Sequence, residues 1–389
     1  MRRGSSRVRL LTDVLLYADT LRSPELRHEV PLGIGDAFLY VERDGERHVV
    51  VGSIELPRLQ GLDGFVVHPF EEFGFDELRR SGKPFGEVLD QVMLRAVRAL
   101  GVERAAVPPT FPLLLADRLR AEGVELAVDR DGFERRRRSK TGAELGGVRR
   151  AQAAAEAGMT AARKLLRRAS EGADGVLEVD GEPLTSERLR AAVGLAFLEH
   201  GAIWDEFVVS HGAQAAIGHH MGEGALHSGE TIVIDLWPRD AESFCCADMT
   251  RTFVVGEIPD EVAEWHGLCL EALEGALAAA RPGVTGKWLF DATCDLFEAA
   301  GYPTQRTKAA GETLDEGFFH SLGHGVGLEV HEAPSLGQAG HEELVPGDVI
   351  ALEPGLYRPG FGGCRLEDLV LVTGDGAENL TRFPYDLVP

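Results

Sequence analysis

Five side chains of metal-binding type follow one another along the C-terminal part of the 389-residue chain. They are four carboxylates and one imidazole: Asp235 in VIDLWP, Asp248 in CADMTRTF, His324 in GHGVGLEVHE, Glu353 in ALEPGLY and Glu367 in CRLEDLVLV. Oxygen donors with a single imidazole suit two divalent cations that share bridging carboxylates. The set therefore predicts a dinuclear metallohydrolase.

Strand-like segments carry these acids. Residues 230–238 and 249–256 have the β-branched pattern of paired strands, which predicts a hairpin with Asp235 and Asp248 on facing strands. Residues 348–357 and 364–373 predict a second pair, in which Glu353 faces Glu367. A lone acid near a turn is usually an exposed strand end, but an unpaired carboxylate inside an apolar strand is costly to bury. The pattern therefore favours ligands.

The elements around these hairpins predict two domains. Helical patterns cover residues 142–169, 260–280 and 286–301. Two halves, each built from helix and hairpin, would therefore hold the metal pair between them. Before residue 140, short apolar runs alternate with helical patterns, which indicates a small α/β domain. We expect domains at residues 1–139 and 140–389, in an α/β protein of 389 residues.

The formal net charge of -23 argues against nucleic acid or an anionic membrane as a partner. The arginine run at residues 135–138 is interpreted as a solvated face or an interdomain contact. Residues 1–20 begin basic, but their apolar stretch is short and interrupted, so neither a signal peptide nor a membrane span is expected. Five cysteines without regular spacing favour a reducing, cytoplasmic location. Of these, Cys245 and Cys246 are expected to be buried apolar residues.

The motifs VIDL, DMTRTF, GHGVGLEVHE, ALEPGLY and RLEDLVLVT, in this order, resemble those of the pita-bread metallopeptidases. That family includes aminopeptidase P, prolidase and methionine aminopeptidase, and the likeness covers roughly residues 140–385. The resemblance implies a C-terminal pita-bread (creatinase/aminopeptidase) domain behind a small N-terminal domain of the creatinase/prolidase type. It places this chain with the Xaa-Pro aminopeptidase and prolidase branch.

The resemblance also implies roles for the site residues. It makes Asp235, Asp248, His324, Glu353 and Glu367 the metal ligands, with Asp248 and Glu367 bridging two divalent ions. Manganese is the expected metal, with cobalt, zinc or iron as alternatives. A hydroxide held between the ions would attack a peptide bond between an N-terminal residue and proline, while Glu353 transfers the proton. The remaining implied site residues are catalytic His219 and His331, with His220 as the alternative to His219, and substrate-lining His320 and Arg365.

Two departures from the family pattern concern the edge of the site. Trp237 stands where the family usually has glycine, and the connection from Asp235 to Asp248 is longer than usual. Short peptides are the expected substrates and a homodimer the expected assembly. Two other functions stay open: a creatinase-like C–N hydrolase, which does not keep the metal set, and a non-catalytic peptide-binding or protein-binding member of the fold.

Overall fold

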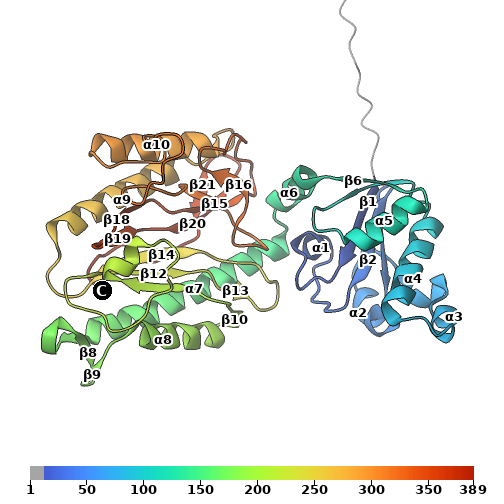
Figure 1. The fold of residues 1–389 in the computed structure, drawn as a ribbon, viewed down its shortest axis with the longest axis horizontal. Helices are drawn as coiled ribbons and strands as arrows, with labels where there is room; N and C mark the ends of the chain where they lie inside the picture. The colour runs from blue at the N-terminus through green and yellow to red at the C-terminus, as the bar shows by residue number, and fades with distance from the viewer. Residues whose placement is uncertain (1–12) are drawn as a thin grey trace, which may run out of the picture. The chain divides into compact units, whose positions relative to one another are not determined.

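The computed structural model describes residues 13–389 of the chain. These residues form two compact units, the first ending at Arg136 and the second running Arg137–Pro389, and the division falls within α6 (Arg130–Arg138) (Figure 1). Most of the basic N-terminal segment discussed above lies outside the described residues. Within residues 13–389, the helices are too short or too polar to cross a membrane.

The first unit is built on a six-stranded mixed sheet in the order β4-β3-β2-β1-β5-β6. Its strands are β1 (Asp13–Ala18), β2 (Phe38–Arg43), β3 (Glu46–Val51), β4 (Val66–Pro69), β5 (Arg104–Val107) and β6 (Glu125–Val128). Its helices are α1 (Pro24–Glu29), α2 (Leu56–Leu59), α3 (Phe75–Arg80), α4 (Phe85–Ala99) and α5 (Leu113–Ala121). Separate apolar clusters form around Leu15 and around Leu16, because neighbouring residues of a strand point to opposite faces. The α/β prediction for this part is confirmed.

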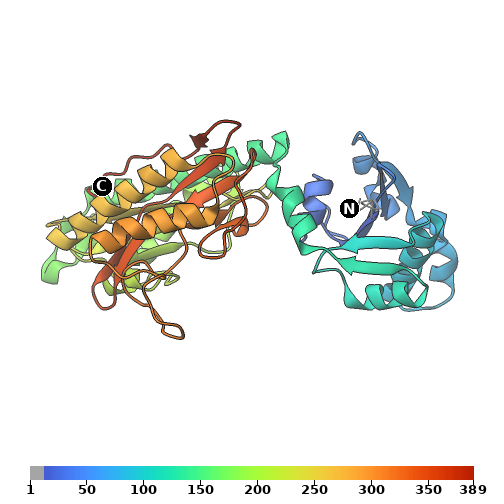
Figure 2. The ribbon, with the colours of Figure 1, turned by 90° about the horizontal axis from the view of Figure 1, so that it is seen from above.

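Helices of the second unit cover its strands from both sides (Figure 1). They are α7 (Gly142–Arg168), α8 (Ser186–Glu199), α9 (Asp260–Ala279) and α10 (Gly286–Ala299). Figure 2 shows α9 and α10 side by side over one face. The α7 start is fixed by a capping box, in which Thr141 Oγ1 accepts from Glu144 N–H while the Glu144 carboxylate accepts from Thr141 N–H. The bounds of α7, α9 and α10 match the predicted ranges closely, whereas α8 was not predicted.

The first predicted hairpin is confirmed. β12 (Thr231–Leu236) pairs antiparallel with β14 (Met249–Val254), and β11 (Val208–His211) completes the sheet on the other side of β12. Asp235 lies opposite Thr250, so Asp248 is two residues from the directly paired position. Side chains at such diagonal positions share a face of the sheet. Both aspartates therefore point to the same side.

The second predicted hairpin is interrupted where the two glutamates lie. β17 (Val349–Leu352) pairs with β20 (Asp368–Val372), whereas β18 (Gly355–Arg358) pairs with β19 (Gly362–Arg365) in a separate ladder. Glu353 and Glu367 stand in the break between the ladders. The sheet of β17 and β20 continues through β15 (Gly323–Gly325), β16 (Glu332–Leu336) and β21 (Ala377–Asn379). His324 thus lies on a strand.

The smaller strands of the second unit form two further sheets. β7 (Ser170–Glu171), β8 (Leu177–Val179) and β9 (Glu182–Pro183) form one sheet, and β10 (Ala202–Ile203) pairs with β13 (Arg239–Asp240). A short 3-10 helix, η4 (Gly212–Ala216), follows β11 and begins the loop that carries His219. One apolar core packs around α7 and α8 and another around α9 and α10.

Candidate active site

A cavity of about 950 Å³ opens in the second unit. Its wall contains every site residue predicted from the sequence: His219, Asp235, Asp248, His320, His324, His331, Glu353, Arg365 and Glu367. Trp237 and Phe319 add aromatic surface to it. Of the two adjacent histidines, His219 lines the cavity, whereas Nδ1 of His220 accepts a hydrogen bond from Gly222 N–H. The structure therefore brings residues together that lie more than 140 positions apart in the chain.

The metal-type side chains converge in the wall of this cavity. Asp248, His324 and Glu367 each offer a donor atom within 4.8 Å of the other two. His324 Nε2 also lies 3.6 Å from Glu353 Oε1. His324 Nδ1–H donates to the Gly325 carbonyl, which leaves the Nε2 lone pair directed at the carboxylates. Metal-ligating histidines usually donate their other ring N–H in this way.

The carboxylates of this cluster cannot all be ionised without a compensating positive charge. The pKa of Asp248 lies well above its usual value because the group is buried and because neighbouring carboxylates, foremost Glu367, repel its charge. Burial and the charges of Asp235 and Glu353 raise the pKa of Glu367 in the same way. Burial lowers the pKa of His324, so its imidazole is neutral near pH 7. This donor set fits divalent cations, which neutralise the carboxylates and accept oxygen and imidazole donors.

Arg365 compensates part of the negative charge and fixes Asp235. Its Nη2 pairs with Asp235 Oδ2, while Asp235 Oδ1 is buried without a hydrogen-bond partner. A buried carboxylate oxygen without a hydrogen-bond partner is available to coordinate a cation. Arg365 Nε–H donates to Thr250 Oγ1 (3.2 Å), and Thr250 Oγ1–H donates to Glu367 Oε2 (2.7 Å). Thr250, which the sequence reasoning missed, therefore orients a predicted bridging ligand.

A second hydrogen-bonded chain joins two residues of the cavity wall, His320 and Arg365. His320 Nδ1–H donates to the Ser321 carbonyl (2.7 Å), so its Nε2 accepts from the Tyr357 hydroxyl (3.0 Å). That hydroxyl in turn accepts from Arg365 Nη1–H (3.1 Å). Tyr357 was also missed, although it belongs to the ALEPGLY motif that carries Glu353. The contact pattern makes Tyr357 the link between the two residues that were expected to line the substrate pocket.

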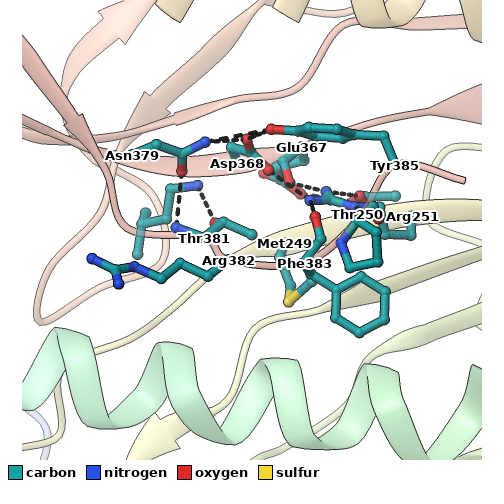
Figure 3. Close-up of polar contacts among 12 residues, drawn as sticks. Met249, Thr250, Arg251, Glu367, Asp368, Asn379, Thr381, Arg382, Phe383 and Tyr385 are labelled. Carbon is teal, nitrogen blue, oxygen red and sulfur yellow. Dashed lines mark hydrogen bonds and ion pairs between the residues drawn. The ribbon is translucent and has the colours of Figure 1, made fainter.

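Behind the ligands lies a buried ion pair between Arg251 and Asp368 (2.9 Å), whose side chains are at most 1% exposed (Figure 3). Arg251 also donates to the carbonyls of Thr250 and Glu367 (2.8 and 2.7 Å). Asp368 Oδ2 accepts from Asn379 and from the Tyr385 hydroxyl (both 2.5 Å). The pair therefore holds the strand of Thr250 against the segment of Glu367.

The longer connection from Asp235 to Asp248 is held by Asp240. Its carboxylate accepts from Arg150 Nε and Nη2 (2.9 and 2.8 Å) and from Ser243 N–H and Oγ–H (2.7 and 2.6 Å). Burial alone would raise the pKa of Asp240, but these hydrogen bonds lower it overall. Cys245 and Cys246 follow in the chain and are buried, as expected, and burial raises the pKa of the Cys245 thiol to about 11.

Comparison with known proteins identifies the class. The model of metallopeptidase family M24 matches residues 146–374, and the chain belongs to this family. A Xaa-Pro dipeptidase of Pyrococcus furiosus is 33% identical over 232 residues, 58% of this chain and 63% of that protein. A probable dipeptidase, PepE, of Mycobacterium tuberculosis is 35% identical over 182 residues, 46% of this chain and 45% of that protein. The matches thus span less than two thirds of these relatives.

Solved structures share the fold over nearly the whole chain. An X-Pro aminopeptidase from Thermotoga maritima matches with a TM-score of 0.77 at 24% identity, covering 97% of both chains. The prolidase from Pyrococcus furiosus matches with a TM-score of 0.73 at 24% identity, covering 96% of both chains. The predicted fold class, a small N-terminal α/β domain followed by a pita-bread domain, is confirmed.

Proposed function

We propose that this chain is a dinuclear metallopeptidase that hydrolyses the bond between an N-terminal residue and proline in short peptides. The observation that carries the proposal is the convergence of four buried or half-buried carboxylates and one neutral histidine on a cavity of peptide size. Family membership and the Xaa-Pro dipeptidase and probable dipeptidase relatives support the substrate class. The proposal keeps the division into domains at residues 1–139 and 140–389.

The residues Asp235, Asp248, His324, Glu353 and Glu367 would hold the cations, with Asp248 and Glu367 shared between them. When bound, two divalent ions supply Lewis acidity and an activated water. Glu353 takes a proton at a carboxylate oxygen and returns it to the leaving nitrogen. Because Glu353 reaches His324 Nε2 at 3.6 Å, this proton transfer occurs beside the metal ligands.

His219 and His331 stabilise the charge that develops on the substrate carbonyl oxygen. Burial, and then the neighbouring His324, lower the pKa of His331, so its ring is a neutral hydrogen-bond donor near pH 7. The His331 and His324 rings meet edge to face at 4.3 Å, which fixes the plane of His331. Each such donor contributes roughly 3 kcal/mol to transition-state stabilisation. His320 and Arg365 shape the substrate side of the cavity.

Three finer parts of the proposal concern the metal, the assembly and the compartment. Manganese is the proposed metal, because carboxylate-rich sites suit hard cations. A homodimer is proposed from the frequency of twofold assemblies, and sedimentation velocity measures it directly. A cytoplasmic location is proposed from the sequence, and all five cysteines are free thiols in the structure.

The proposal is tested with metal-stripped protein reconstituted separately with manganese, cobalt and zinc. The substrates are Xaa-Pro dipeptides, Xaa-Pro-Yaa peptides, proline-free peptides and creatine. Metal-dependent cleavage of the proline substrates is expected. Glu353→Ala should lower kcat about 10²–10⁴-fold. Glu257→Ala changes an exposed glutamate and should leave kcat unchanged. Cleavage of creatine alone, or full turnover by Glu353→Ala, would overturn the proposal.

A further inference from the structure

A second group of metal-binding side chains lies at the base of the loop that carries His219. His211 ends β11, and His227 and Glu230 flank the turn that leads into β12. Each offers a donor atom within 4.8 Å of the other two. None of the three belongs to the wall of the catalytic cavity described above. The group is therefore separate from the proposed catalytic centre.

The hydrogen bond of His211 Nε2 determines which ring nitrogen carries a lone pair. Nε2 lies 3.1 Å from the Glu223 carbonyl, which can only accept, so Nε2 carries the hydrogen. In the neutral ring Nδ1 then presents its lone pair to Glu230 Oε2, 3.0 Å away. Two lone pairs repel at this distance, so a positive charge must stand between them or on the ring. Ligating histidines have this arrangement, with the far N–H donated to a backbone carbonyl.

The separations between donors match those around a small tetrahedral ion. Bonds of about 2.0–2.1 Å at tetrahedral angles place donor atoms about 3.3 Å apart. The Nδ1 atoms of His211 and His227 lie 3.0 and 3.8 Å from the same Glu230 oxygen, which brackets this spacing. Small shifts of side chains would therefore form the site.

The surrounding structure favours a cation and leaves it accessible. The His211 side chain is 9% exposed, whereas those of His227 and Glu230 are 42% and 38% exposed, so water can reach a remaining coordination position. The segment at Glu223 is held by Gln214, whose amide donates to the Glu223 carbonyl and accepts from its N–H. The Glu187 carboxylate contributes further negative charge near His211.

We propose that His211, His227 and Glu230 bind a zinc-type divalent ion through two imidazole nitrogens and one carboxylate oxygen, with water completing the coordination. Such an ion would join both ends of the loop between β11 and β12. The site is structural in kind, and its existence is independent of the peptidase activity proposed above.

Zinc titration of chelator-treated protein against a chromophoric competitor tests the site. His227→Ala is the main variant, because this partly exposed side chain can be removed without opening the core. Glu230→Gln is the second, and His341→Ala removes an exposed histidine elsewhere as the control. We expect His227→Ala and Glu230→Gln to bind one zinc per chain fewer than the wild type and His341→Ala do. The loss of affinity at this site should exceed the roughly 10–100-fold that follows loss of an outer-shell partner.

The difference of one ion is expected whatever number the catalytic centre holds, so failure of the proposed function would not affect it. Zinc should also raise the Tm of the wild type more than that of either variant, since an ion that binds only the folded state stabilises it. Equal zinc stoichiometry, affinity and Tm shift in all four proteins would overturn the site. His211 and Glu230 would then form an ordinary imidazolium–carboxylate pair.

Discussion

Asp368→Asn removes the charge that compensates Arg251 but keeps the shape of the side chain. Arg251 is 1% exposed and keeps its hydrogen bonds to backbone carbonyls, so it would remain in place as an unpaired cation. Breaking a buried pair in this way costs about 3–5 kcal/mol of the free energy of unfolding. We expect a loss of this size in Asp368→Asn, because the guanidinium stays bonded to the backbone of Thr250 and Glu367 and so remains buried.

The double variant Arg251→Met/Asp368→Leu separates lost charge from lost packing. It removes both ions, so the cost of an unpaired charge disappears. The Asn379 and Tyr385 donors to Asp368 would still lose their acceptor, at about 1–3 kcal/mol. The double variant should therefore be more stable than Asp368→Asn. As a control, Asp386→Asn removes the exposed partner (64%) of the Arg163 pair and should cost under about 1 kcal/mol.

Tryptophan fluorescence during urea unfolding measures these differences in the second unit alone. All four tryptophans of the chain, at positions 204, 237, 265 and 288, lie in that unit. A double-mutant cycle with the single variants Arg251→Met and Asp368→Leu then gives the coupling energy. If the double variant loses as much stability as the two single variants combined, the charges are not coupled and the reasoning is wrong.

Three further predictions address residues around the site. Thr250→Val removes the hydroxyl that binds Glu367 and should weaken metal affinity roughly 10–100-fold, measured by competition with a chelator, with Thr250→Ser restoring it. Asp240→Asn should lower the free energy of unfolding near pH 7, because the pKa of Asp240 is lowered in the fold. The difference in unfolding free energy between the variant and the wild type should shrink below about pH 3.9, and urea titrations at several pH values measure it. Gly222→Ala should lower the free energy of unfolding in urea by more than about 1 kcal/mol and impair turnover, because φ is +84° and a Cβ would meet the Val209 carbonyl. The control Gly224→Ala, at φ +80° in open space, should show only the cost of backbone strain.

The convergence of these acids on one cavity could be predicted because they interrupt strands that should be apolar. Asp235 follows TIVI and Glu367 precedes LVLV, so each residue conflicts with its local pattern unless it has a buried partner. Strand pairing then places Asp235 and Asp248 on one face. The interruption at Glu353 and Glu367 was not predicted, although Pro354 and Gly355 directly after Glu353 are residues that commonly interrupt a strand.

The residues behind the candidate ligands could not be identified from the sequence for a different reason. Arg251 stands in TRTF like an outward-facing strand residue, and its partner Asp368 is 117 positions away. Its burial depends on how two sheets pack, which local periodicity does not report. The arginine run shows the same limit: of its two expected settings, the solvated face is wrong for Arg137 and Arg138, whose side chains are 7% exposed and pair with Glu329 and Asp348.

The charge balance of the cavity explains why this fold can keep so many acids together. Arg365 is the cation bonded to Asp235, and its remaining contacts go to neutral hydroxyls. One guanidinium cannot neutralise four carboxylates, so without bound cations the raised pKa values of Asp248 and Glu367 favour their protonated forms. Binding divalent ions then releases those protons, which makes metal affinity fall as the pH falls. Arg251 and Asp368, which neutralise each other behind the ligands, add no net charge to this balance while fixing the backbone from which Glu367 projects.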